Sequence, residues 1–190
     1  METKTLLITG FMPFGGDTRN PSWEAVSLLP DTVGAYRLFK LLLPVEFGHA
    51  AQIAIKEAEA IGADAILCVG LAAGRPAITP ERIGINLREA RIPDNAGFAP
   101  MDKPVVPDGP DAYFSTLPVR SMTEAIVGEK IPAVVSYSAG TYVCNDLLYT
   151  LLYHFHGTGT RVAFIHVPSE SETFPLSVMS QALCAAIKAI

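Results

Sequence analysis

Runs of consecutive apolar residues recur along the chain, and each has the length of a buried strand. The runs predict five strands, over residues 5–9, 36–43, 65–69, 134–137 and 161–167. A strand that is apolar at every position is buried on both faces, which is typical of parallel sheets with helices on both sides. The pattern therefore predicts a largely parallel sheet.

Between these runs, apolar residues are spaced as on one face of a helix. Ser22 has the side chain of an N-cap residue, and Gly62 follows the second helical segment as a glycine C-cap would. Strands alternating with helices predict an α/β fold whose sheet is covered on both faces. The expected helices span residues 23–29, 48–61, 119–128, 142–155 and 176–190.

Two segments do not follow this alternation. Residues 82–89 are expected to be extended, and residues 94–118 are rich in Pro, Gly and Asp. A loop as long as 94–118 is uncommon inside a domain and is usually functional or covered by a partner. We therefore expect this segment to contribute to a site or to an interface.

The composition is that of one domain spanning residues 1–190 with ample apolar surface: 49% of residues are hydrophobic and 17% are charged. The net charge is -5 and no Lys/Arg-rich run is present, which argues against nucleic-acid and membrane-surface partners. No apolar run approaches the roughly 20 residues of a membrane helix. The N-terminus does not resemble a signal peptide, so a cytoplasmic protein is expected.

The three cysteines, Cys68, Cys144 and Cys184, form no CxxC pair. Such sparse cysteines predict neither a disulfide framework nor a zinc site, and they are typical of a reducing compartment. Cys68 lies inside an apolar strand and Cys184 in the terminal helix, so both are interpreted as structural.

Cys144 is different because it falls in the first turn of a predicted helix, directly after the Ala139-Gly140 turn. A helix N-terminus has unpaired N–H groups and partial positive charge, which stabilise a thiolate and can lower the pKa of a thiol. The same N–H groups can bind an oxyanion. The alternative is that Cys144 is a small buried core residue.

A thiol nucleophile requires a base, and His166 closes the apolar strand 161–167. The carboxyl ends of parallel strands are where ligands bind, so His166 is expected near Cys144. His154 and His156 lie late in a predicted helix, and His49 begins another. A structural role for His166 is the alternative.

The imidazole requires an acceptor that holds its orientation, and two carboxylates are candidates. Glu81 follows the strand ending at Val69, whereas Asp94 lies in Arg91-Ile-Pro-Asp-Asn95. Glu81 could equally pair with Arg82 at the surface. Spacing alone does not choose between the two carboxylates.

Phe11 and Phe14 lie in a Gly/Pro loop directly after the first strand. Two aromatic residues there predict a small apolar slot for a flat ligand. The alternative is that both plug the loop against the sheet.

Four longer motifs complete this pattern and resemble the pyrrolidone-carboxylate peptidase family, also called pyroglutamyl peptidase I. The N-terminal motif is Thr9-Gly-Phe-Met-Pro-Phe-Gly-Gly16, with Asn20-Pro-Ser22 after it. The others are Ile78-Thr-Pro-Glu-Arg-Ile-Gly-Ile-Asn86 with Arg91-Ile-Pro-Asp-Asn95, then Ala139-Gly-Thr-Tyr-Val-Cys-Asn145, then Phe164-Ile-His-Val-Pro168. They occur in the family's order and cover nearly the whole chain.

The resemblance implies Cys144 as nucleophile, His166 as general base and acid, and Glu81 rather than Asp94 as the orienting carboxylate. It implies that the chain hydrolyses the bond after an N-terminal pyroglutamyl residue of peptides. The expected ring-binding residues are Phe11, Phe14, Tyr142, Val143 and Ile92, with Arg91 as an oxyanion donor beside the N–H of Cys144.

The resemblance further implies a three-layer α/β/α sandwich with a mostly parallel, twisted sheet, no metal or organic cofactor, and a homo-oligomer, dimeric or tetrameric. Met12 and Leu71 depart from the family's usual Glu and Gln, so altered affinity is expected. Two other functions stay open: a non-catalytic binder of N-terminally blocked peptides, and a nucleoside phosphorylase-like enzyme, for which no Gly-rich phosphate loop is found.

Overall fold

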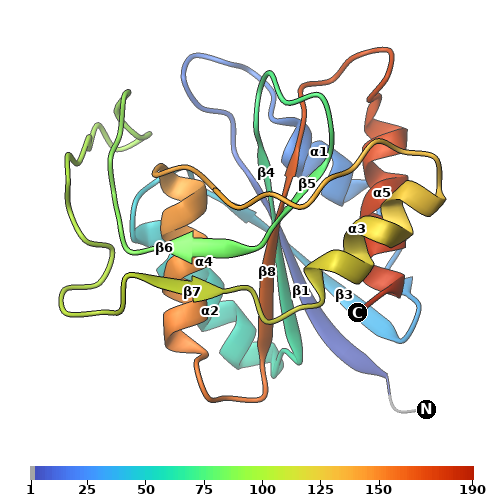
Figure 1. Cartoon of the computed structure of the whole chain (residues 1–190), viewed down its shortest axis with the longest axis horizontal. Coiled ribbons are helices and arrows are strands. Elements are labelled where there is room, and N and C mark those ends of the chain that lie inside the picture. The colour runs from blue at the N-terminus through green and yellow to red at the C-terminus, as the bar shows by residue number, and fades with distance from the viewer. Residues whose placement is uncertain (1–2) are drawn as a thin grey trace.

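The centre of the molecule is a twisted six-stranded sheet with strand order β2-β3-β1-β4-β8-β5 (Figure 1). The computed structural model describes residues 3–190. The four central strands run parallel, and the edge strands β2 and β5 are antiparallel to their neighbours. The strands of the sheet are β1 (Lys4–Phe11), β2 (Thr32–Val33), β3 (Tyr36–Leu43), β4 (Ala65–Leu71), β5 (Thr79–Glu81) and β8 (Arg161–Val167).

Helices cover both faces of the sheet, which confirms the expected three-layer α/β/α fold (Figure 1). One face packs against α1, α3 and α5, and the other against α2 and α4. The alternation of side chains along β1 builds both interfaces, because Leu6 and Ile8 point to the first face and Leu7 and Phe11 to the second. The helices are α1 (Pro21–Ser27), α2 (His49–Ile61), α3 (Val119–Gly128), α4 (Val143–His154) and α5 (Leu176–Lys188).

The prediction of a strand over residues 134–137 is wrong. Among the described residues this segment runs along β5 but makes one isolated bridge, between Glu81 and Ser136, and a second bridge joins Ile78 to Ala133 just before it. The N–H of Ser136 donates to the carbonyl of Pro80, and the N–H of Arg82 donates to that of Ser136. Pro80 has no N–H to donate to residue 134, so the ladder is interrupted there.

The N-cap prediction for the first helix is also wrong by two residues. Asn20 is the N-cap of α1, and its Oδ1 accepts from the N–H and the hydroxyl of Ser22. Pro21 occupies the first helical position, where its missing N–H costs nothing. The hydroxyl of Ser22 instead accepts from the N–H of Phe11, which ties the end of β1 to the helix.

The long segment 94–118, called the excursion below, is joined to the rest of the protein by a short antiparallel pair of strands. The pair consists of β6 (Ile83–Ile85), which precedes the excursion, and β7 (Ala112–Phe114), which lies near its end. This pair packs against α4, where Gly84 lies over Leu148 and Tyr149. None of the helices within residues 3–190 combines the length and the apolar character that crossing a bilayer requires.

Candidate active site

Strand register brings Glu81 and His166 together. In the antiparallel β5–β8 pair, Glu81 lies opposite Phe164, so His166 is its diagonal neighbour on the same face of the sheet. His166 Nδ1 and Glu81 Oε1 are 2.7 Å apart, and both side chains are buried. This contact fixes the plane of the imidazole and leaves Nε2 free for chemistry.

Asp94, the other candidate carboxylate, serves a different purpose. Its Oδ1 accepts from the N–H groups of Ala96 and Phe98, and its Oδ2 accepts from the N–H of Phe47. Asp94 therefore organises the start of the excursion, whereas Glu81 holds the imidazole.

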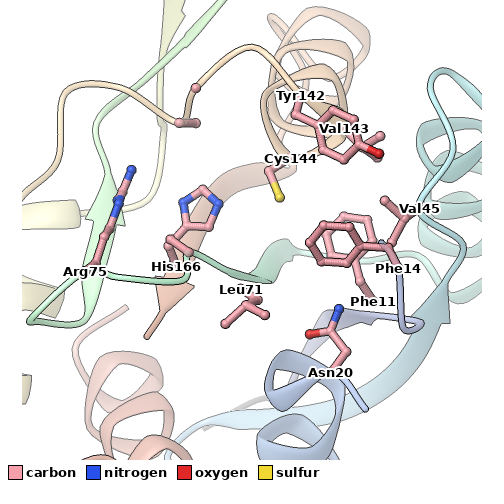
Figure 2. A pocket seen from close by; sticks show the side chains of 13 residues that line it. Phe11, Phe14, Asn20, Val45, Leu71, Arg75, Tyr142, Val143, Cys144 and His166 are labelled. Carbon is pink, nitrogen blue, oxygen red and sulfur yellow. The ribbon is translucent and has the colours of Figure 1, made fainter. Parts of the chain in front are cut away.

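Cys144 is the second residue of α4, in the first turn as expected. Its sulfur and the ring of His166 point into the same cavity (Figure 2). The N-cap residue, Tyr142, caps the helix with no side-chain hydrogen bond, so N–H groups of the first turn stay available to an oxyanion. A thiol, an imidazole held by a carboxylate, and free N–H groups are the parts that acyl transfer requires.

Burial decides the resting charge state of this site. It raises the pKa of the Cys144 thiol to about 12, and the negative charge of Glu81 adds to this effect. The expectation of a lowered thiol pKa is therefore wrong for the free protein, because burial outweighs the lowering contributions of Arg75 and of the backbone N–H of Cys144. The same burial lowers the pKa of His166, so the resting pair is a thiol and a neutral imidazole.

The start of α4 is anchored by the two residues that follow Cys144. Asn145, fully buried, accepts from the N–H of Ile85 and donates to the carbonyls of Ile85 and Leu87. Asp146, also fully buried, accepts from the N–H of Gly48 and from Arg88. These bonds fix the helix N-terminus relative to β6 and α2.

A largely apolar cavity of about 180 Å³ lies at the carboxyl ends of β1, β4 and β8 (Figure 2). Four of the predicted ring-binding residues line it, namely Phe11, Phe14, Tyr142 and Val143, together with Cys144 and His166. The remaining lining residues are Asn20, Val45, Leu71, Ala72, Arg75, Ala139 and Gly140.

Arg91 and Ile92 do not line this cavity. Both are exposed and line a neighbouring cavity of about 430 Å³, which shares Phe14, Gly140 and Tyr142 with the first. The roles expected of Arg91 as an oxyanion donor and of Ile92 in ring binding stay predictions.

The other histidines lie elsewhere. His49 contacts Glu46, and His154 contacts Glu59, in both cases with exposed imidazoles. Within residues 3–190 no group of three or more His, Cys, Asp or Glu side chains is arranged to hold a metal ion.

Arg75 is the site residue that the sequence interpretation missed. Its Nη1 lies 2.6 Å from Glu81 Oε1, and its Nη2 donates to the carbonyl of Ser138 at 2.9 Å. Arg75 lies in an irregular segment without periodicity, and the only signal was its position six residues after the end of the predicted strand 65–69. Asn20 was missed as a lining residue because its capping role was assigned to Ser22.

Comparison with known proteins agrees with this geometry. A family model described as pyroglutamyl peptidase matches residues 4–184. A pyrrolidone-carboxylate peptidase of Chromobacterium violaceum is 49% identical over 166 residues, which cover 87% of this chain and 78% of that protein. One of Staphylococcus aureus is 44% identical over 196 residues, covering 97% and 92%.

Solved structures give the same result. The pyroglutamyl peptidase I of Bacillus amyloliquefaciens matches with a TM-score of 0.93 and 41% identity, covering 98% of this chain and 96% of that one. The pyrrolidone carboxyl peptidase of Thermococcus litoralis also has a TM-score of 0.93, with 35% identity and coverage of 98% and 92%. With its fold, its site geometry and the match over residues 4–184 all in agreement, this chain belongs to the pyroglutamyl peptidase family.

Proposed function

We propose that the protein is a cysteine peptidase that hydrolyses the amide bond after an N-terminal pyroglutamyl residue of peptides, with residues 1–190 forming one catalytic domain. The observation that carries this proposal is the placement of Cys144 and His166 on one apolar cavity, with His166 held by the buried Glu81. The names of the relatives support the substrate class. Neither a phosphorylase-like enzyme nor a non-catalytic binder is favoured by these comparisons.

The first chemical step is acylation of Cys144. Neutral His166 takes the thiol proton at Nε2 while the sulfur attacks the pyroglutamyl carbonyl carbon. The oxygen becomes negative and is stabilised by the first-turn N–H groups of α4, including that of Cys144. Because burial raises the pKa of the thiol, the resting sulfur carries its proton, and His166 removes that proton for the attack.

The tetrahedral intermediate collapses when the C–N bond breaks. The imidazolium of His166 gives its proton to the departing amine, which leaves as the shortened peptide, and a thioester forms on Cys144. Water then loses a proton to His166 and attacks the thioester carbonyl. The C–S bond then breaks, free pyroglutamic acid leaves, and His166 returns its proton to the sulfur of Cys144, which restores the thiol.

The cavity suits a flat, uncharged ring. Phe14 and Tyr142 lie with ring centroids 6.2 Å apart, and Phe11 closes the floor at the end of β1. A pyroglutamyl residue has a lactam in place of an ammonium group, so its recognition requires apolar contact with few hydrogen bonds. An acidic ammonium-binding group is not required.

The assay compares Cys144→Ala with Cys184→Ala on a pyroglutamyl chromogenic amide. Cys184 is half-buried in α5 and lines no part of the cavity, so its variant controls for loss of a thiol. We expect Cys144→Ala to lose all turnover and Cys184→Ala to keep it. Turnover is expected to survive EDTA and to stop with iodoacetamide. Undiminished turnover by Cys144→Ala would refute the proposal.

The same proposal includes a homo-oligomer in a reducing compartment such as the cytoplasm. Three large apolar side chains are exposed in or just before the segment 94–118, namely Ile92, Phe98 and Met101. Such a concentration is typical of a surface that another chain covers. Light scattering on the purified protein measures the assembly, and a monomer at micromolar concentration would contradict this part.

A further inference from the structure

The side chain of Arg75 connects three parts of the candidate site that are far apart in sequence. Nη1 donates to Glu81 Oε1 at 2.6 Å and also to Thr79. Nη2 donates at 2.9 Å to the carbonyl of Ser138, in the turn that leads into α4. Arg75 also lines the cavity, and its side chain is 29% exposed.

Glu81 depends on this cation. Its side chain is fully buried, and Oε1 is shared between Arg75 and His166. The second oxygen, Oε2, has no hydrogen-bond partner among residues 3–190. A buried carboxylate that loses its cation is strongly disfavoured, and it then tends to take up a proton or to rearrange.

The turn before Cys144 depends on the same guanidinium. Within this turn Ser136, Ser138 and Gly140 are linked by long side-chain bonds of 3.2–3.3 Å. The bond from Arg75 to Ser138 is shorter and charge-assisted, so it is the stronger restraint. It joins this turn to the carboxylate that holds His166.

The charges alternate across the site. Arg75 is positive, Glu81 negative, His166 becomes positive during attack, and the sulfur of Cys144 becomes negative. The positive charge of Arg75 favours the thiolate and disfavours the imidazolium, whereas Glu81 has the opposite effect on both groups. Acting together, the two side chains let the proton move from sulfur to nitrogen without a large net charge in the interior.

We propose that Arg75 is a positioning residue for the pyroglutamyl transfer reaction: through Glu81 it holds His166, and through Ser138 it holds the turn that places Cys144. The inference rests on the proposed function, since it assigns Arg75 to that reaction. A guanidinium is required because its rigid fork reaches both acceptors at once, whereas a lysine ammonium is a single point charge.

Three variants separate charge from geometry: Arg75→Met, Arg75→Lys and the control Arg161→Met. Arg161 is also half-buried and donates a side-chain bond to the hydroxyl of Tyr36, but it begins β8 at the end opposite His166. The control therefore reports what loss of a half-buried arginine does to the fold. All variants are assayed on a pyroglutamyl amide across the pH range, with unfolding measured in parallel.

For Arg75→Met we expect kcat/KM to fall about 100-fold, mainly in kcat, because base and nucleophile lose their alignment. Removal of a positive charge raises proton affinity, so the acidic limb of the pH–rate profile moves up by roughly one unit. Arg75→Lys keeps the positive charge but loses the hydrogen bond to the carbonyl of Ser138. It is expected to leave the acidic limb in place while kcat falls about tenfold.

If Arg75 were purely structural, its replacement would lower stability without shifting the acidic limb of the pH–rate profile. This is the result expected of Arg161→Met. The inference is overturned if the acidic limb of the pH–rate profile of Arg75→Met stays at the wild-type pH, or if its kcat/KM stays within about twofold of wild type. If Arg75→Met does not fold, a wild-type kcat in Arg75→Lys overturns it. Failure of the proposed function looks different, because the wild-type protein would then release no amine or Cys144→Ala would stay active.

Discussion

Gly70 lies directly opposite His166 in the parallel β4–β8 pair, and the space above it is filled by the sulfur of Cys144. A Cβ built at Gly70 would lie 2.9 Å from that sulfur and 2.6 Å from Cζ of Phe164. The ring of Phe164 in turn packs against the imidazole of His166, with centroids 4.7 Å apart. Because Gly70 has no side chain, it leaves the space that the sulfur of Cys144 occupies and that the ring of Phe164, beside His166, requires.

Gly70→Ala is expected to displace Cys144 and Phe164 and to lower kcat/KM by about 100-fold, because misplacement by about 1 Å can cost that much. Overpacking should also destabilise the fold by roughly 1–3 kcal/mol. Gly159→Ala is the matched control, since no atom of residues 3–190 would lie within 4 Å of a Cβ at this position. Equal kcat/KM values for the two variants would show that a methyl group at position 70 does not displace the sulfur of Cys144, which would contradict the prediction.

The alkylation rate of Cys144 is expected to depend steeply on pH. Because the pKa of this thiol is raised to about 12, the resting protein holds little thiolate near neutral pH. The rate with iodoacetamide, followed at Cys144 by peptide mass spectrometry, should rise about tenfold per pH unit between pH 7 and 9. A plateau in this range would indicate a preformed thiolate–imidazolium pair.

Asn145→Ala is expected to destabilise the protein by roughly 2–4 kcal/mol. The variant leaves three backbone groups of Ile85 and Leu87 without the partner that the fully buried Asn145 provides. Urea unfolding measures the loss. Asn95→Ala is the control. Asn95 is exposed, and within residues 3–190 its side chain donates one bond, to the carbonyl of Pro13, so a loss below about 1 kcal/mol is expected. Similar losses in both variants would contradict the anchoring role.

Leu71→Gln is expected to improve binding of a pyroglutamyl substrate. Leu71 lines the cavity at the end of β4, where an amide could exchange hydrogen bonds with the lactam. We expect KM to fall roughly fivefold with kcat within about twofold of wild type, since one neutral hydrogen bond contributes about 1 kcal/mol. Leu28→Gln, on the exposed C-cap of α1, controls for added polarity. A raised KM would show that Leu71 contributes apolar contact instead.

The local sequence pattern was sufficient to predict most helices and strands of the fold. The strands 36–43 and 161–167 and the helix 119–128 have the predicted bounds, and Gly62 ends α2 as its C-cap in the left-handed conformation. These elements follow from periodicity and from caps, which act over a few residues. The strand expected at 134–137 failed for a long-range reason, because its partner β5 carries Pro80.

The candidate site divides in the same way. The sequence by itself determined the residue types and their order, including the cysteine in a first helical turn and the histidine at a strand end, because both are local features. Spacing left Glu81 and Asp94 open, and the family resemblance implied Glu81. Only the tertiary structure decided how Glu81 contacts His166, that Arg75 joins Glu81 to Ser138, and that burial raises the thiol pKa. Those outcomes depend on strand register and on exclusion of water, and both are set by segments that meet only when the whole chain has folded.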